Sequence, residues 1–302
     1  GRTCIARCPP RYPGRVMDRR ELKSNGRVAH SSLQGQVAAD RFVQGSPMRV
    51  SVPVASLFDS IDPEHWNRER ELVLHDVFHV LEESSAWVFG YAEKDGYVGY
   101  MRRVDLAHAN GMTPTHIVST RQSYLTTTPT LKNKSQMAPI SFGTAFQVLA
   151  THENGRWAEV ATLHPSPAFV PAQHLRPVGA PETDPANVAE RFLGTPYHWG
   201  GNSGFGIDCS GLVQAALVAC AIPCPGDSDQ QETNLGEALP KGASTQRNDL
   251  LFWKGHVALA VSDSTLIHAT GESSTLVLAG IDTALARIEN QGDGQTTRHK
   301  RL

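Results

Sequence analysis

The sequence has no long run of like charge and no long apolar stretch. Its 28 basic and 30 acidic residues give a formal net charge of -2. Affinity for nucleic acid comes mainly from clustered Lys and Arg, so we expect no nucleic-acid partner. The longest apolar stretch, residues 212–222, is interrupted by Gln214 and is too short to cross a bilayer. We therefore also expect no membrane insertion.

Cysteine is scarce, with five residues in a chain of 302. These are too few and too unevenly placed for a disulfide scaffold. Cys4 and Cys8 have a three-residue spacer, as do Cys220 and Cys224, and the second spacer contains Pro223. This spacing is a poor match to a zinc site. We expect neither a metal nor a cofactor.

A targeting signal is also missing from the first sixteen residues. They contain Arg, Pro and Cys but no apolar core of the length that a signal peptide needs. Met17 precedes a more ordinary polar segment, so translation could begin there, with residues 1–16 as extra sequence. We expect a cytoplasmic protein. The alternative is a secreted or periplasmic protein whose signal peptide is absent from this sequence.

An internal repeat organises the first half of the chain. Residues 77–81 (VFHVL) and 145–149 (AFQVL) are similar, and each is followed by a tryptophan and a second short strand. Period-2 alternation between turn signals indicates short antiparallel strands. A repeat of about 70 residues made of strands and turns predicts two small β-barrels in tandem. We place them at residues 46–110 and 114–178, where they resemble bacterial SH3-like domains.

The alternating strand pattern ends at a linker, residues 179–185, and a pattern with helices begins after it. Asp184 is a suitable cap for a helix that follows the linker, and residues 209–222 predict a second, apolar helix. Three stretches look like strands: residues 250–253, 257–261 and 265–268. Helices followed by strands predict an α+β domain over residues 186–302. The role of the N-terminal extension, residues 1–45, cannot be inferred from its sequence.

Cys209 lies where the apolar helix is expected to begin. The first turn of a helix is the positive end of its dipole, which favours thiolate over thiol. Backbone N–H groups left free there can stabilise an oxyanion. A nucleophilic cysteine also needs a base, and His256 and His268 lie on predicted strands. A neutral imidazole can accept the thiol proton while a second polar group orients the ring.

Five motifs occur in a fixed order around these residues. They are residues 196–201 (PYHWGG), 208–211 (DCSG), 249–252 (DLLF), 255–257 (GHV) and 267–269 (IHA). Together they resemble the NlpC/p60 family of cell-wall cysteine peptidases, relatives of papain. The resemblance implies that Cys209 is the nucleophile, His256 the general base and His268 the residue that orients it. Tyr197 then assists the oxyanion site. Asn248 stands where the family usually has Gly, which should alter a turn.

The resemblance also implies a substrate class. The family cleaves bonds made through the γ-carboxyl of D-glutamate, usually before lysine or diaminopimelate in peptidoglycan stems. Two SH3-like domains ahead of the catalytic domain narrow it to members similar to dipeptidyl-peptidase VI, which act on freed stem peptides with an unblocked N-terminal L-alanine. In them an acid and a tyrosine of the first SH3-like domain meet the substrate amine, and Asp76 and Tyr97 are expected in those roles. Asp208, Ser210 and Ser228 match positions that contact the dipeptide.

The sequence thus predicts an α+β protein with two SH3-like β-barrels followed by a papain-like NlpC/p60 catalytic domain. We expect a cysteine peptidase that hydrolyses the γ-D-glutamyl–L-diamino acid bond of freed murein peptides. One alternative is an endopeptidase acting on intact peptidoglycan through wall-binding barrels. Another is a non-catalytic wall-binding protein. The presence of all four expected catalytic residues argues against it: Cys209, His256, His268 and Tyr197.

Several residues keep a purely structural alternative. Tyr97 could be an ordinary strand aromatic, and Asp76 and Ser228 could be turn residues. Tyr197 could serve in packing alone. The choice between lysine and diaminopimelate, and the oligomeric state, cannot be inferred from the sequence.

Overall fold

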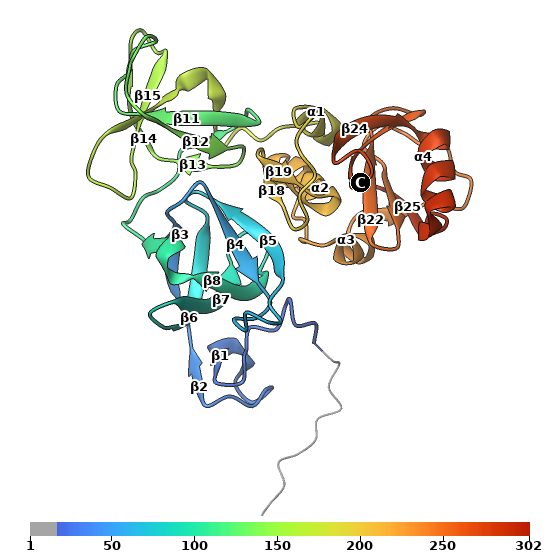
Figure 1. Cartoon of the computed structure of the whole chain (residues 1–302), viewed down its shortest axis with the longest axis horizontal. Coiled ribbons are helices and arrows are strands. Elements are labelled where there is room, and N and C mark those ends of the chain that lie inside the picture. Colours follow the sequence, from blue (N-terminus) through green and yellow to red (C-terminus); the bar gives the residue numbers. More distant parts are fainter. Residues whose placement is uncertain (1–16) are drawn as a thin grey trace, which may run out of the picture.

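The structure is a computed structural model that describes residues 17–302. Two β-rich bodies lie beside a C-terminal domain that contains the longer helices (Figure 1). Cys4 and Cys8 lie outside the described residues. Across residues 17–302, no helix has both the length and the apolar character needed to span a membrane.

The described part of the N-terminal extension packs on the first β-body. Strands β1 (Val28–His30) and β2 (Arg41–Val43) form a parallel pair, with the 3₁₀ helix η1 (Ser31–Leu33) between them. Val28 is fully buried in a small apolar cluster with Leu81, Phe89 and Val98. The extension is therefore held to the first body by apolar contacts that its sequence did not reveal.

The first β-body is one sheet of seven strands in the order β5-β4-β8-β7-β6-β3-β9. The strands are β3 (Ser46–Val50), β4 (Val54–Phe58), β5 (Arg68–Val73), β6 (Val77–Glu83), β7 (Trp87–Ala92), β8 (Val98–Arg102) and β9 (Leu106–His108). Alternating residues such as Met48, Leu57 and Phe78 fill its core. The 3₁₀ helix η2 (Arg103–Asp105) joins the last two strands.

The second β-body repeats this arrangement. It contains a five-stranded sheet in the order β12-β11-β16-β15-β14 and a three-stranded sheet in the order β13-β10-β17. The strands are β10 (His116–Val118), β11 (Gln122–Thr126), β12 (Met137–Ser141), β13 (Ala145–Phe146), β14 (Val148–His152), β15 (Trp157–Val160), β16 (Ala168–Pro171) and β17 (Leu175–Pro177). Its 3₁₀ helix η3 (Ala172–His174) precedes the last strand, as η2 does in the first body. The SH3-like nature of this second body and the domain boundaries stay predictions.

The C-terminal domain is a six-stranded sheet with helices on both faces. Its order is β20-β25-β21-β22-β23-β24. The strands are β20 (Glu237–Ala238), β21 (Leu250–Trp253), β22 (His256–Ala260), β23 (Thr265–Thr270), β24 (Thr275–Gly280) and β25 (Arg298–Arg301). The helices are α1 (Pro185–Glu190), α2 (Cys209–Ala219), α3 (Ser228–Asn234) and α4 (Ile281–Ile288). A two-stranded hairpin, β18 (Asn202–Ser203) and β19 (Gly206–Ile207), precedes α2.

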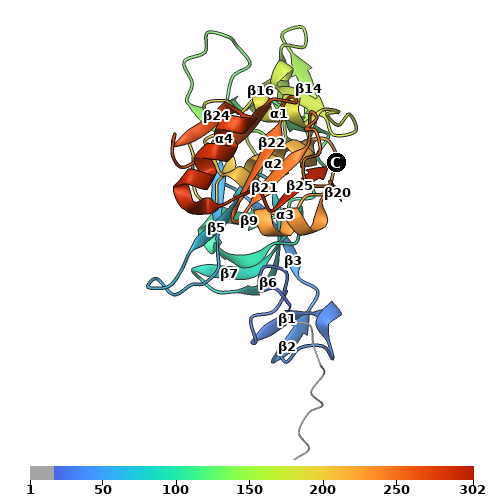
Figure 2. The ribbon, with the colours of Figure 1, turned by 90° about the vertical axis from the view of Figure 1, so that its right-hand side faces the viewer.

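Alternation along the central strands explains the two covered faces. Leu250, Phe252 and Val257 face the core that contains α1 and α2. Leu251, Trp253 and Ala258 face the core that contains α4. Figure 2 shows α4 lying across the outer face of the sheet. Both faces of the sheet are thus shielded from water, as in other layered α+β domains.

Two local expectations from the sequence need correction. Asp184 precedes α1 but makes no capping hydrogen bond, because its carboxylate pairs with Arg247 instead. The cap comes from Asn248, whose side-chain oxygen accepts the N–H of Ala186 at 2.8 Å. Asn248 also has a left-handed backbone (φ 75°), a conformation that Asn tolerates better than most residues. The turn keeps a glycine-like shape and gains a helix cap.

Candidate active site

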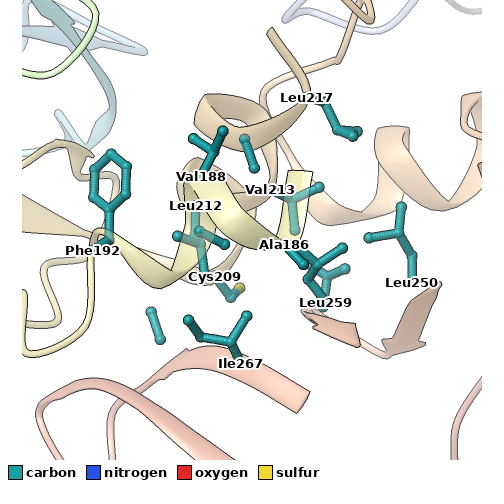
Figure 3. Close-up of a cluster of buried hydrophobic side chains, with 14 of the residues drawn as sticks. Ala186, Val188, Phe192, Cys209, Leu212, Val213, Leu217, Leu250, Leu259 and Ile267 are labelled. Atoms are coloured by element: carbon teal, nitrogen blue, oxygen red, sulfur yellow. The ribbon is translucent and has the colours of Figure 1, made fainter. Parts of the chain in front are cut away.

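Cys209 is the first residue of α2. Asp208 caps the helix, since its Oδ1 accepts the N–H of Gly211 at 2.7 Å and its Oδ2 accepts the N–H of Gly200 at 3.0 Å. The Cys209 side chain is 8% exposed and lies at the edge of the apolar cluster between α2 and the sheet, beside Ile267 in Figure 3. The cap and the cluster together fix the position of the thiol.

The resting thiol is protonated. Burial, and to a smaller extent the charge of Asp208, raises the pKa of Cys209 to about 12. The N–H groups of Val257 and Ser210 and the charge of Arg70 act in the opposite direction but do not prevail. Desolvation of the thiolate therefore opposes the ionisation that a helix start favours. Cys209 needs a base to lose its proton.

His256, the first residue of β22, and His268 on β23 form a hydrogen-bonded pair. Nε2 of His256 lies 2.9 Å from Nδ1 of His268, on the adjacent strand. The contact of the Val257 N–H with the sulfur puts the start of β22 beside Cys209. Burial lowers the pKa of both histidines, and the positive charge of Arg287 lowers both further. Both rings are therefore neutral near pH 7 and able to accept a proton.

A pocket of about 340 Å³ opens over Cys209. Tyr197, Trp199 and Gly255 form part of its wall. Four carboxylates also line it, from Glu69, Asp208, Asp227 and Asp229, together with the guanidinium of Arg20. Glu69 comes from β5 of the first β-body, so the pocket lies between two parts of the chain. The excess of carboxylates favours a cationic group in the ligand.

Comparison with known proteins assigns this region to a family. Residues 194–287 match the NlpC/P60 family, and residues 62–106 match the bacterial dipeptidyl-peptidase SH3 domain. The C-terminal domain is an NlpC/P60 domain. The resemblance to this family, expected from the motifs, is therefore confirmed for these residues.

Relatives and a solved structure agree with this assignment. The chain is 29% identical over 211 residues to a gamma-D-glutamyl-L-lysine dipeptidyl-peptidase of Bacillus cereus, covering 63% of this chain. It is 27% identical over 193 residues to dipeptidyl-peptidase 6 of Lysinibacillus sphaericus, covering 58% of this chain and 69% of that protein. The match spans 61% of the Bacillus cereus relative's length.

A crystal structure of an NlpC/P60 family protein from Bacillus cereus has a similar fold. The TM-score is 0.71 at 21% identity, over 85% of this chain and 99% of that one. The expected α+β fold with an SH3-like domain ahead of the NlpC/P60 domain is confirmed.

The structure brings most of the expected site residues together. Cys209, Tyr197, Asp208, Ser210 and Ser228 share the pocket. Tyr197 is partly buried, and burial with the nearby Cys209 and Asp208 raises its pKa to about 12, so its phenol is a neutral hydrogen-bond donor. The hydroxyl of Ser210 donates to Asp208 at 3.2 Å. Their roles toward a substrate remain proposals.

Tyr97 does not line this pocket but contacts Asp227, which does. Its side chain is 4% exposed, and its hydroxyl donates to Oδ2 of Asp227 at 2.8 Å. Asp227 in turn lines the pocket above Cys209. The hydroxyl of Tyr97 therefore orients a carboxylate of the NlpC/P60 domain, whereas direct contact with an amine was expected.

Asp76 does not reach this pocket, which corrects the expectation for it. The chain turns sharply between β5 and β6, with His75 in a left-handed conformation (φ 70°). The Asp76 carboxylate folds back to accept the N–H of Val73 at 3.0 Å and lies 3.5 Å from Nζ of Lys94. It lines a different cavity of about 350 Å³, at the junction of the three bodies. Asp76 is a turn residue.

The acid that the first β-body contributes is Glu69. Gly200 of the NlpC/P60 domain allows the approach, because a Cβ there would lie 2.9 Å from the carbonyl oxygen of Glu69. The signal in the sequence was the charged run at residues 68–71 (RERE) inside a strand. Two of these side chains, Arg70 and Glu71, are buried at the contact with the NlpC/P60 domain. Charged residues are seldom buried without partners across a contact.

Arg70 is the second residue that the sequence did not reveal. Its side chain is 3% exposed and lies 3.7 Å from Asp208 and 3.8 Å from Asp227. It also donates to the hydroxyl of Ser210 at 3.3 Å. The buried guanidinium therefore offsets the negative charge of Asp208 and Asp227, which both line the pocket. The first β-body thus completes the electrostatics of the NlpC/P60 site.

Proposed function

We propose that the protein is a cysteine peptidase that hydrolyses the γ-D-glutamyl–L-diamino acid bond of freed murein stem peptides with a free N-terminal L-alanine. The carrying observation is that one pocket holds Cys209 together with Glu69, Asp227 and Asp229. These carboxylates suit the α-ammonium of an unblocked peptide. The names of the Bacillus cereus and Lysinibacillus sphaericus relatives support the same substrate class.

The chemical step begins with proton transfer. Nε2 of His256 is engaged by His268, so Nδ1 is the nitrogen that takes the proton from Cys209. The resulting thiolate attacks the γ-carbonyl carbon of D-glutamate and forms a tetrahedral intermediate. The hydroxyl of Tyr197 and the backbone N–H groups at the start of α2 stabilise its oxyanion.

Collapse of this intermediate releases the diamino acid. The C–N bond breaks, and His256 gives its proton to the departing amine. A water molecule then attacks the thioester, with His256 taking one of its protons. Release of L-Ala-γ-D-Glu restores the thiol of Cys209. His268 keeps the His256 ring oriented through both steps, through the 2.9 Å contact between the rings.

We call the part of the pocket lined by Glu69, Asp227 and Asp229 its acidic end. In this proposal the acidic end sets the length of the peptide segment on the amino side of the cleaved bond. Glu69 and Asp227 offer oxygens to the ammonium, and Tyr97 holds the Asp227 carboxylate from behind. A charge-assisted hydrogen bond contributes about 1.5–3 kcal/mol, so a free amine adds substantially to binding. Asp208, Ser210 and Ser228 line the same pocket as Cys209. In this proposal they contact the backbone of the dipeptide.

Recycling of freed peptides in the cytoplasm follows from this preference. Stem peptides still attached to glycan have no free alanine amine, so an acidic amine subsite selects against them. Cys209, Cys220 and Cys224 are all free thiols, which suits a reducing compartment. Location in the cytoplasm is part of the proposal.

The test is to incubate the protein with L-Ala-γ-D-Glu-L-Lys and with its diaminopimelate counterpart and to identify the products by mass. We expect L-Ala-γ-D-Glu and the free diamino acid, with no release of alanine. Cys209→Ala should give no product. Cleavage at the alanine bond, or release of peptides from intact sacculi but not from free tripeptide, would contradict the proposal and favour the wall endopeptidase.

A further inference from the structure

The chain ahead of the first β-body contributes to the pocket. Residues 18–22 form a turn in which the N–H groups of Glu21 and Leu22 donate to the carbonyl of Asp18 at 3.0 and 2.9 Å. The carbonyl of Arg20 accepts the N–H of Val98 at 2.8 Å, which ties the turn to β8. Two consecutive arginines, Arg19 and Arg20, are thereby held beside the acidic end of the pocket.

Arg20 anchors this turn to α3. Its Nη1 donates to Asp227 at 2.7 Å and to Asp229 at 2.8 Å, and its Nη2 donates to Asp18 at 2.6 Å and to Asp229 at 2.7 Å. Its Nε donates to Asp18 at 3.0 Å. All three nitrogens are engaged and the side chain is 19% exposed. Arg20 therefore holds the turn against Asp227 and Asp229, and it has no N–H left to donate to a ligand.

Arg19 is bound much less tightly. Its Nη2 lies 2.5 Å from both carboxylate oxygens of Glu69, and its side chain is 48% exposed. No second partner of its guanidinium is recorded among residues 17–302. Glu69 is 22% exposed and is the carboxylate that the proposed function assigns to the substrate amine. A cation of the protein itself therefore pairs with this carboxylate.

We propose that Arg19 is a specificity residue that competes with the substrate ammonium for Glu69, and that Arg20 holds it in reach. This rests on the proposed role of Glu69. A free amine can exchange for the guanidinium and leave Glu69 paired. A blocked, neutral terminus can displace Arg19 only by leaving that carboxylate without a cation. Because exposed ion pairs are weak, the exchange lowers the affinity for the true substrate only a few-fold.

The test uses protection of Cys209, so it does not depend on peptide hydrolysis. Alkylation of Cys209 by iodoacetamide is followed by mass while L-alanine amide, a cation, is added in increasing concentration. We expect Arg19→Ala to lower the half-protecting concentration about three- to fivefold. Protection by the neutral N-acetyl-L-alanine amide should not improve in this way. Arg19→Lys retains a cation and should stay close to the unmodified protein.

Arg27→Ala is the matched control. Arg27 lies in the same extension, is 56% exposed and pairs with Glu82, but it does not line the pocket above Cys209. It should leave the half-protecting concentration unchanged. A damaged fold would weaken protection, whereas the inference predicts that Arg19→Ala strengthens it.

An unchanged or higher half-protecting concentration in Arg19→Ala overturns the inference, as does a lack of protection in every variant. If Arg19→Ala strengthens protection while no γ-D-glutamyl peptide is cleaved, the inference holds and the proposed function fails. If the peptides are cleaved but Arg19→Ala has no effect, the inference alone fails.

Discussion

The hydroxyl of Tyr97 and the carboxylate of Asp227 lie 2.8 Å apart, across the contact between the first β-body and the NlpC/P60 domain. Asp227 precedes α3 and lines the pocket, whereas Tyr97 is buried in the first β-body. Arg20 donates to the same Asp227 oxygen at 2.7 Å. One pocket carboxylate is thus oriented by two groups from outside its own domain.

This relationship predicts the effect of Tyr97→Phe. The variant keeps the packing of the ring but removes one hydrogen bond to a charged group, which contributes about 1.5 kcal/mol or more. We expect KM for L-Ala-γ-D-Glu-L-Lys to rise about tenfold with a smaller change in kcat. Tyr91→Phe, in the same barrel and outside the pocket, is the control. An unchanged KM in Tyr97→Phe would show that Asp227 does not meet the substrate.

Thiol labelling tests the nucleophile. In the proposed mechanism His256 takes up the proton of Cys209, whereas Cys224 is buried and its thiol donates to the carbonyl of Pro225. We expect iodoacetamide at pH 7–8 to modify Cys209 faster than Cys220 or Cys224, by mass analysis of peptides. His256→Ala should remove this advantage, while His268→Asn should retain part of it. Equal labelling of the three thiols would argue against the pairing of Cys209 with His256.

Arg287 predicts a shift in the pH profile. Its Nη2 lies 3.4 Å from Nε2 of His268, and its positive charge lowers the pKa of both histidines. Removing that charge in Arg287→Ala should raise the pKa of His256. Since the base must be neutral, the acid limb of kcat/KM should then move to higher pH. Arg298→Ala, an exposed arginine on β25, should leave the limb in place. A shift to lower pH in Arg287→Ala would contradict this account.

The histidine pair also predicts acid sensitivity of the fold. Both pKa values are lowered by burial from the ordinary 6.5, so the unfolded chain binds protons that the folded chain does not. The stability that the neutral rings contribute is complete above about pH 6.5 and is lost as the pH falls below it. We expect the urea midpoint to drop between pH 7.5 and pH 5, and to drop less in the His256→Gln/His268→Gln double variant. An equal drop would mean that other groups carry the effect.

Much of the fold followed from local patterns. Residues 250–253 were expected as a strand and form β21, and the apolar helix expected to begin at residue 209 forms α2. The helix ends at Ala219, short of the expected residue 222, because Ala221 takes a left-handed conformation (φ 58°). Hydrophobic period is a local property that can be inferred from neighbouring residues alone, whereas the cap of α1 comes from Asn248, far along the chain.

The acidic end of the pocket could not be predicted in this way. Glu69 and Asp76 are both acids of the first β-body, and only the path of β5 past Gly200 decides which one reaches Cys209. Arg20 lies about two hundred residues before its partner Asp229. Contacts between bodies depend on how whole domains pack, which no local pattern encodes.

The most direct test of the account compares kcat/KM for L-Ala-γ-D-Glu-L-Lys with that for its N-acetylated form. Acetylation removes the charge that Glu69 and Asp227 bind, so we expect a loss of about a hundredfold or more in the unmodified protein. Glu69→Gln should lose most of this discrimination, whereas Asp76→Asn, in the other cavity, should keep it. Equal rates for free and acetylated peptides, or discrimination that survives in Glu69→Gln and disappears in Asp76→Asn, would contradict the account.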